Sequence, residues 1–241
     1  MTDKSLEILP DKSSLIERSL QLVLKKMVTA IEQKGQCTIA LSGGSTPKPL
    51  YEALASQDLP WNQIHIFWGD ERYVPASHPD SNEGMARQAW LNQVPIPAAN
   101  IHAMITNEAD PAIAAQKTEQ HLQEFFKVSP GVFPALDIIL LGMGADGHTA
   151  SLFPHTEALQ VCDRLITVGN KDGQPRLTFT ISLINQAHCV LFVVAGADKQ
   201  PALAQVFADQ GDALTYPSRF IKPQGELIWL LDFAAGEILA G

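Results

Sequence analysis

The chain has 241 residues, of which 46% are hydrophobic and 18% are charged, and its formal net charge is −9 at pH 7. A chain of this length and composition can bury a sizeable core and is unlike an intrinsically disordered protein. The negative charge disfavours nonspecific binding to nucleic acid or to an anionic membrane, although a few basic side chains could still converge on a small anionic ligand.

The N-terminus and the cysteines favour a cytoplasmic location. Residues 1–5 lack the charged and then apolar pattern of a signal peptide, and no apolar run approaches the length of a membrane span. Cys37, Cys162 and Cys189 are far apart and form no Cys-x-x-Cys pair. Cys37 and Cys189 lie in apolar runs and are expected in the core, which fits a reducing compartment.

The first predicted element is a helix. Residues 14–17 read Ser-Leu-Ile-Glu, the pattern of an N-terminal capping box, and apolar residues then recur with helical spacing from Ile16 to Ile31. Gly35 is placed to end this helix.

A glycine-rich loop follows a short apolar strand predicted over 37–41. The loop contains Gly43, Gly44, Ser45 and Thr46, with Thr46 as the expected N-cap and Pro47 as the first residue of the next helix. Backbone N–H groups and the positive end of the helix dipole would then face one point, which favours phosphate binding. The spacing is not that of a Walker loop, and a tight turn without a ligand is the alternative.

Charged side chains follow the next predicted strand, over 64–68. Asp70, Glu71 and Arg72 form either a solvated turn or a polar cluster in a cleft. Further along, Ser81 or Asn82 is expected to cap a helix over 83–91, a small strand is expected over 100–104, and a helix is expected over 111–126 with His121 near its surface.

The most informative stretch is 137–154. An apolar run over 138–141 predicts a strand buried on both faces, and three glycines in the following loop surround Asp146 and His148. A histidine in such a loop is where open α/β sheets place their chemistry. Thr149 or Ser151 could cap a short helix after it.

This stretch has two other interpretations. Residues 142–147 satisfy Gly-x-Gly-x-x-Gly, but a dinucleotide site needs a long following helix, and Pro154 comes seven residues after Gly147. The other alternative is a structural turn with a solvated His148.

The remaining pattern predicts the fold class. Strands are expected over 165–168, 189–195 and 227–231, a polar loop over 170–176, and renewed apolar alternation over 177–181. Strands that alternate with helices predict one α/β domain over 1–241, a three-layer α/β/α arrangement with a mostly parallel, Rossmann-like sheet and helices on both faces. The loops at residues 42–46, 70–72, 146–148 and 199 would then meet in one cleft.

These loops resemble those of the 6-phosphogluconolactonase family of the oxidative pentose phosphate pathway. The resemblance runs from about Leu15 to Ala235, and its most specific segment is 141–154, Leu-Gly-Met-Gly-Ala-Asp-Gly-His-Thr-Ala-Ser-Leu-Phe-Pro. The other matching motifs are Leu-Ser-Gly-Gly-Ser-Thr-Pro (41–47), Phe-Trp-Gly-Asp-Glu-Arg-Tyr-Val-Pro (67–75), Asp-Ser-Asn (80–82), Pro-Arg-Leu-Thr (175–178) and Trp-Leu-Leu-Asp (229–232).

Two related functions remain as alternatives. Glucosamine-6-phosphate deaminase/isomerases share the expected fold and a similar histidine loop, but their loop continues toward a catalytic Glu, whereas this chain continues Ala-Ser-Leu-Phe-Pro over 150–154. They also have Asp-Glu-Tyr where this chain has Asp-Glu-Arg at 70–72. A non-catalytic sugar-phosphate sensor is the other alternative, although the chain has no helix-turn-helix segment or basic DNA-binding patch.

The resemblance implies roles for particular residues. His148 would be the general base that activates water against the lactone carbonyl of 6-phospho-D-glucono-1,5-lactone, and Asp70 or Asp146 would orient it. The phosphate would lie on Gly43–Thr46 with Arg176 and Lys199, and Arg72 would contact either the phosphate or the carbonyl.

Several other features are not expected. There is no Gly-x-Ser-x-Gly elbow for a serine nucleophile. No cofactor or metal is predicted, because His148 and His155 are seven residues apart without a third ligand at zincin spacing. The resemblance implies a small-molecule sugar-phosphate lactone as the partner, neither nucleic acid nor membrane, and a monomer or weak homodimer. His65, His78, His102 and His188 are expected in structural or surface positions.

Overall fold

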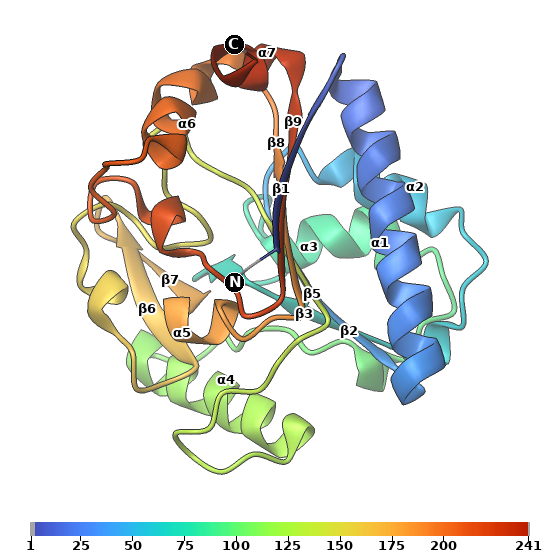
Figure 1. Cartoon of the computed structure of the whole chain (residues 1–241). Helices are drawn as coiled ribbons and strands as arrows, with labels where there is room; N and C mark the ends of the chain where they lie inside the picture. Colours follow the sequence, from blue (N-terminus) through green and yellow to red (C-terminus); the bar gives the residue numbers. More distant parts are fainter. Residues whose placement is uncertain (1–2, 241) are drawn as a thin grey trace.

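The computed structural model describes residues 3–240, and a six-stranded parallel sheet runs through its centre (Figure 1). The strand order is β1-β9-β8-β5-β2-β3, and every neighbouring pair is parallel. Every residue of β2, β5 and β8 is buried, which explains why these strands read as continuous apolar runs. The bounds are β1 Asp3–Leu9, β2 Cys37–Leu41, β3 Ile64–Trp68, β5 Ile138–Leu141, β8 Cys189–Val194 and β9 Glu226–Asp232.

Helices cover both faces of this sheet, as the sequence predicts. In Figure 1 the sheet is seen nearly edge-on, with α1 and α2 on one side and α5 and α6 on the other. The bounds are α1 Lys12–Lys34, α2 Lys48–Ala55, α3 Asn82–Ala86, α4 Pro111–Phe126, α5 Ile181–Ile184, α6 Gln200–Phe207 and α7 Phe233–Gly236. A π turn at Arg87–Leu91 continues α3, and short 3₁₀ turns lie at Trp61–Gln63, Ala98–Asn100, Glu157–Gln160, Ala197–Lys199, Pro217–Phe220 and Glu237–Leu239.

A second, antiparallel sheet was not predicted. Its three strands are ordered β4-β7-β6, with bounds β4 Asp70–Arg72, β6 Ile166–Lys171 and β7 Gln174–Phe179. The expected polar loop over 170–176 is therefore wrong, because Asp172 and Gly173 turn the chain with positive φ and both flanks are strand. Asp-Gly is a common turn pair in two-residue β-hairpins. As a result Arg176 lies on β7, in register with Arg72 on β4.

Two predicted helix starts need correction. Helix α1 begins at Lys12, and its N-cap is Asp11, whose carboxylate accepts from Ser14 N at 2.8 Å. Ser14 therefore donates to the cap and is not the cap itself. Helix α2 begins at Lys48 with Pro47 before it and no side-chain cap, so Thr46 is not an N-cap. Ser81 does cap α3, and Gly35 ends α1 in the left-handed region.

Two further segments differ from expectation. The strand expected over 100–104 is reduced to one bridge between Ile66 and Ile101. No helix begins at Thr149 or Ser151, and Thr149 and Leu152 instead form an isolated bridge. Strand β1, at the edge of the sheet, was not predicted.

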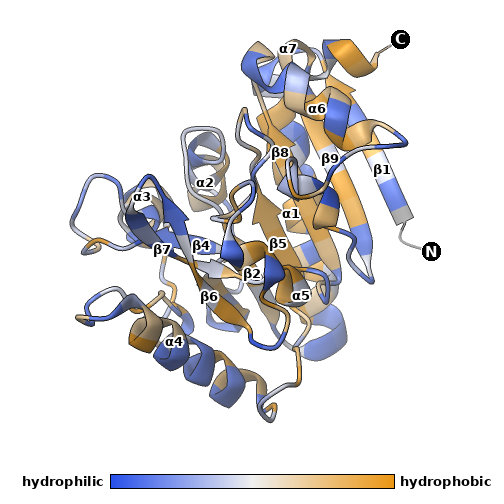
Figure 2. Cartoon of the chain, turned by 90° about the vertical axis from the view of Figure 1, so that its left-hand side faces the viewer, coloured by the Kyte–Doolittle hydropathy of each residue, from blue (hydrophilic) through white to orange (hydrophobic). Residues whose placement is uncertain are grey.

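The core follows the hydropathy of the chain, with apolar residues along β5, β8 and β9 and polar residues along the outer side of α4 (Figure 2). Phe192 and Trp229 stack across β8 and β9 with ring centroids 3.7 Å apart. Cys37 and Cys189 are buried, as predicted. Cys162, for which no prediction was made, is exposed. Within residues 3–240, no helix has the length and apolar character needed to cross a membrane.

Candidate active site

A cavity of about 260 Å³ opens at the carboxyl ends of β2, β5 and β8. Its lining comes from the loops that follow these strands, residues 42–47, 142–144 and 193–195, and from side chains of the small antiparallel sheet. Carboxyl ends of parallel strands are the usual ligand-binding edge of an open α/β sheet. Of the residues proposed from the sequence, all but Asp146 line this cavity, namely Gly43, Gly44, Ser45, Thr46, Asp70, Arg72, His148, Arg176 and Lys199.

The glycine-rich loop after β2 offers free backbone donors. The Tyr51 hydroxyl accepts from Ser42 N at 3.0 Å and donates to Ser42 O at 2.7 Å, which fixes the start of the loop. Within residues 3–240, the N–H groups of Gly43 to Thr46 donate to no protein acceptor. Gly44 has a φ of 97°, which favours glycine at that point of the turn. An anion placed here would meet several N–H groups near the start of α2.

His148 is held by the carboxylate two residues before it. Its ring Nδ1 lies 2.5 Å from Asp146 Oδ1, and the same oxygen accepts from His148 N at 3.1 Å. An ionised carboxylate can only accept, so Nδ1 carries the proton and Nε2 keeps a lone pair. Nε2 has no hydrogen-bond partner among the described residues, and the imidazole lines the cavity.

The hydrogen bond with His148 keeps the Asp146 carboxylate ionised. Burial raises the pKa of the Asp146 carboxyl, but the hydrogen bond from His148 and the charge of its ring outweigh burial and bring the pKa down to about 2. Asp146 is therefore ionised throughout the neutral range, as an orienting carboxylate must be.

Close packing holds the imidazole in this orientation. A Cβ atom on Gly144 would lie 2.1 Å from His148 Nδ1 and 2.5 Å from Asp146 Oδ1, so only glycine fits beside the pair. On another side, the ring of Phe153 lies 4.5 Å from the imidazole, measured between centroids. Phe153 also lies under the Arg176 guanidinium, at 5.8 Å.

Asp70 has a different set of contacts. Its carboxylate accepts from Ser151 Oγ at 2.6 Å and, at 3.4 Å, from Asn82 Nδ2. No contact with His148 occurs among the described residues, so of the two carboxylates considered from the sequence only Asp146 touches the imidazole. Asp70 is only 7% exposed and ties the histidine loop to β4 through Ser151.

Three basic side chains form one wall of the cavity. Within residues 3–240, neither Arg72 nor Arg176 has a carboxylate oxygen within 4 Å, and the Nε atom of each is buried without a partner. Burial lowers the pKa of Arg176, and the charge of Arg72 lowers it further. The remaining cation, Lys199, pairs with Asp198 at 2.8 Å. Two neighbouring guanidinium groups without ion pairs would be stabilised by a bound anion.

Sequence reasoning missed three residues of this site. The sequence predicts Asn82 only as a helix cap, yet this residue lines the cavity and donates to Asp70 O at 2.8 Å. Ser151 was considered as a cap and instead donates to Asp70. Phe153 was not singled out at all. The available signal was that all three lie in the matching motifs over 80–82 and 141–154.

The other histidines lie away from the cavity. His65, His102 and His121 form a hydrogen-bonded chain between β3 and α4, and His155 Nε2 lies 3.2 Å from Thr215 Oγ1. In the part of the chain that the structure describes, no three His, Cys, Asp or Glu side chains are grouped so that they could hold a metal ion.

Comparison with known proteins agrees with this geometry. Residues 10–229 match the family model described as glucosamine-6-phosphate isomerases/6-phosphogluconolactonase. A 6-phosphogluconolactonase of a Nostoc species is 69% identical, covering 98% of this chain and 99% of that protein, and one from Synechocystis is 66% identical, covering 97% of each. A solved structure of 6-phosphogluconolactonase from Trypanosoma cruzi superposes with a TM-score of 0.89 at 28% identity, covering 100% of this chain and 99% of that one. The chain therefore belongs to the glucosamine-6-phosphate isomerase/6-phosphogluconolactonase family.

Proposed function

We propose that this chain hydrolyses 6-phospho-D-glucono-1,5-lactone to 6-phospho-D-gluconate at the cavity, with His148 as the general base. The activity agrees with the names of the Nostoc and Synechocystis relatives described above, each of which covers nearly the whole chain. The observation that carries the assignment of His148 is its position: a cavity histidine with Nδ1 engaged by Asp146 and Nε2 free.

The phosphate of the substrate binds at the basic wall. Residues 43–46 supply free N–H groups, and Arg176 and Lys199 supply positive charge. Arg72 lies beside Arg176 in the register of the small sheet, so it can contact the same phosphate or reach the carbonyl. The planar fork of an arginine binds phosphate oxygens in pairs, which favours this wall over the neutral parts of the cavity.

The lactone carbonyl then lies toward His148. Nε2 takes a proton from a water molecule as that water attacks C1, and a tetrahedral intermediate forms. Backbone N–H groups of the glycine-rich loops stabilise its negative oxygen. As the C1–O bond to the ring oxygen breaks, the imidazolium returns the proton to that oxygen. Asp146 holds the imidazole in one tautomer throughout and stabilises its charged form.

The compartment and assembly are also part of the proposal. The free cysteines, two of them buried, support a reducing cytoplasm, and a monomer or weak homodimer is expected.

The test of this function compares two substrates. Acid release above the spontaneous background is measured for 6-phosphogluconolactone and for unphosphorylated gluconolactone. A much higher kcat/KM is expected for the phosphorylated lactone, because only it can use the basic wall. Equal kcat/KM values for the two lactones would contradict the proposed phosphate site. Release of ammonia from glucosamine 6-phosphate would assign the chain to the isomerase branch of the family.

A further inference from the structure

Glu71 is a buried carboxylate beside the cavity that the reaction described above does not use. It is the middle residue of β4, and its neighbours Asp70 and Arg72 both line the cavity. Successive side chains of a strand point to opposite faces, so Glu71 points away from the cavity. Its side chain is only 3% exposed, and no basic side chain pairs with it in the part of the chain that the structure describes. A buried carboxylate without a cation needs hydrogen-bond donors.

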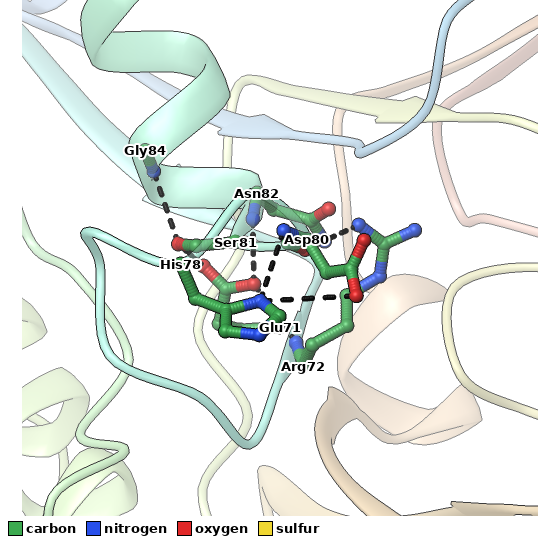
Figure 3. A network of polar contacts seen from close by, with 7 residues as sticks. All are labelled: Glu71, Arg72, His78, Asp80, Ser81, Asn82 and Gly84. Atoms are coloured by element: carbon green, nitrogen blue, oxygen red, sulfur yellow. Dashed lines mark hydrogen bonds and ion pairs between the residues drawn. The ribbon is translucent and has the colours of Figure 1, made fainter.

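Three of the four donors come from residues 81–83, and Figure 3 draws those of Ser81 and Asn82 beside Glu71. Glu71 Oε1 accepts from Arg72 N at 2.8 Å and from Asn82 N at 2.7 Å. Oε2 accepts from Glu83 N at 2.7 Å and from Ser81 Oγ at 3.1 Å. Ser81 Oγ in turn accepts from Gly84 N at 3.0 Å. One carboxylate therefore joins β4 to the first turn of α3, and three of its four contacts are to backbone N–H groups, from which it can only accept.

The hydrogen bonds of Glu71 fix the positions of two residues that line the cavity, Asn82 and Arg72. Asn82 is held by its backbone N–H to Glu71, while its side chain donates to Asp70 O and packs against Gly43 of the glycine-rich loop. A Cβ atom on Gly43 would lie 1.9 Å from Asn82 Oδ1, so the Asn82 side chain and the Gly43 backbone are in close contact. Arg72 is held by its own N–H to Glu71, and its Nη1 donates to Asp80 O at 2.6 Å.

The loop between β4 and α3 cannot fix the positions of Asn82 and Arg72 by itself. Residues 75–80 are exposed, and apart from the bond that Asp80 O accepts from Arg72 Nη1, their contacts in Figure 3 are local, such as Asp80 N donating to His78 Nδ1 at 3.1 Å. Ser81 and Asn82, by contrast, are each 1% exposed. The change from an exposed loop to a buried cavity wall thus occurs where Glu71 binds the chain.

We infer that Glu71 is a positioning residue for the substrate-binding wall. Its carboxylate holds residues 81–83 against β4, so that Asn82 and Arg72 meet the substrate in one arrangement. The kinetic consequence of this inference rests on the proposed function. The hydrogen bonds of Glu71 to residues 72 and 81–83, here called the clamp, are a property of the protein without substrate.

Glu71→Gln tests the inference. The amide has almost the shape of the carboxylate, but its NH₂ group would face backbone donors and leave at least one of them unpaired. Because Arg72 and Asn82 would lose their fixed positions, KM for 6-phosphogluconolactone should rise by about 10- to 100-fold, with kcat changed much less. Amide hydrogen exchange at Asn82 and Glu83 should accelerate, while exchange in β5 and β8 stays at the wild-type rate.

A matched control is Glu83→Gln. It removes the same charge from the same segment, but the Glu83 side chain pairs with Arg87 and does not touch Glu71. Its KM and its amide exchange at Asn82 should match the wild type. If Glu71→Gln fails to fold, Ser81→Ala removes one of the four donors and should give a smaller rise in KM with the same local change in exchange.

Each outcome decides the inference. A folded Glu71→Gln protein with wild-type KM would overturn it, as would a lower kcat at unchanged KM, which indicates loss of active protein and not displacement of a binding wall. In the fallback variant, unchanged KM and unchanged exchange would overturn it equally. The exchange measurement needs no substrate, so it tests the clamp even if wild-type protein fails to hydrolyse the lactone and the proposed function falls.

Discussion

At the scale of single residues, the proposed function of His148 depends on the residues that contact it. His148 acquires its proposed role from Asp146, which fixes the proton on Nδ1, and from Gly144, which leaves room for the pair. Both contacts lie within a few residues of the histidine. The tie between Asp70 and Ser151, by contrast, spans 81 residues of sequence, so no local pattern could predict it.

Gly144→Ala should impair catalysis without unfolding the protein. The new methyl group would overlap the imidazole and the carboxylate, so the ring must move. We expect kcat to fall on the order of 100-fold, the effect of about 1 Å of misplacement. Gly69→Ala is the control, because its Cβ would meet only ordinary contacts, with Leu41 O nearest at 3.7 Å. Similar kcat values for the two variants would contradict the packing argument.

Arg176→Ala and Lys199→Ala should mainly raise KM. Phosphate contacts made in both the ground state and the transition state contribute to uniform binding. Each lost charge-assisted contact should cost about 1.5–3 kcal/mol. Steady-state kinetics with unphosphorylated gluconolactone provides the control, since neither variant should affect it. A variant with wild-type KM for the phosphorylated lactone at physiological salt would place that residue outside the phosphate site.

At the scale of elements, the strands that are buried on both faces could be predicted from their apolar runs, and β2 and β3 have the predicted bounds. The small sheet could not, because β4 has only three residues and its pairing with β7 joins residues about a hundred positions apart. Arg176 was consequently expected in a loop, although its inclusion in the site needed only that it lie near the cleft.

Helix α4 is joined to the sheet by a histidine chain with a predictable response to pH. His65 Nδ1 lies 3.1 Å from His102 Nε2, and His102 Nδ1 lies 2.8 Å from His121 Nε2. Burial, followed by the charges of His121 and His65, lowers the pKa of His102 to about 4, and burial also lowers the pKa of His65. These rings are therefore neutral in the folded protein at pH values where the unfolded chain takes up protons.

Stability should fall as the pH drops from about 6.5 toward 4, because the unfolded state binds more protons in that window. His102 contributes at most about 3 kcal/mol, and less in practice because the ring is partly exposed to water. Urea unfolding at pH 7 and pH 5 measures this loss. His102→Gln should reduce the pH dependence, whereas His188→Gln, at an exposed position, should keep it. An unchanged dependence in His102→Gln would contradict the assignment.

At the scale of the whole molecule, alternating strands and helices were sufficient to predict the parallel sheet, its helical layers and the edge where the loops meet. This follows because parallel strands place all their carboxyl ends on one side. The orientation of each side chain at that edge could not be predicted, since it depends on contacts such as those of Asn82 with Asp70 and Gly43.

Activity should be unaffected by a chelator. His148 Nδ1 is engaged by Asp146, and within residues 3–240 no group of three ligating side chains could hold a metal ion. Lactone hydrolysis is compared before and after incubation with EDTA. Activity that disappears and is restored by added zinc would show that a ligand set has been overlooked.

The most direct test of the account is hydrolysis of 6-phosphogluconolactone by the wild-type protein and by His148→Ala, measured above the spontaneous background. The variant should fold normally and bind 6-phosphogluconate with little loss of affinity, because the phosphate is held by other groups. Its kcat should fall by about 10²–10⁴-fold, the usual contribution of a positioned general acid–base group. Asp146, with a pKa of about 2, should stay ionised throughout these measurements. A properly folded His148→Ala protein with wild-type kcat would contradict the mechanism.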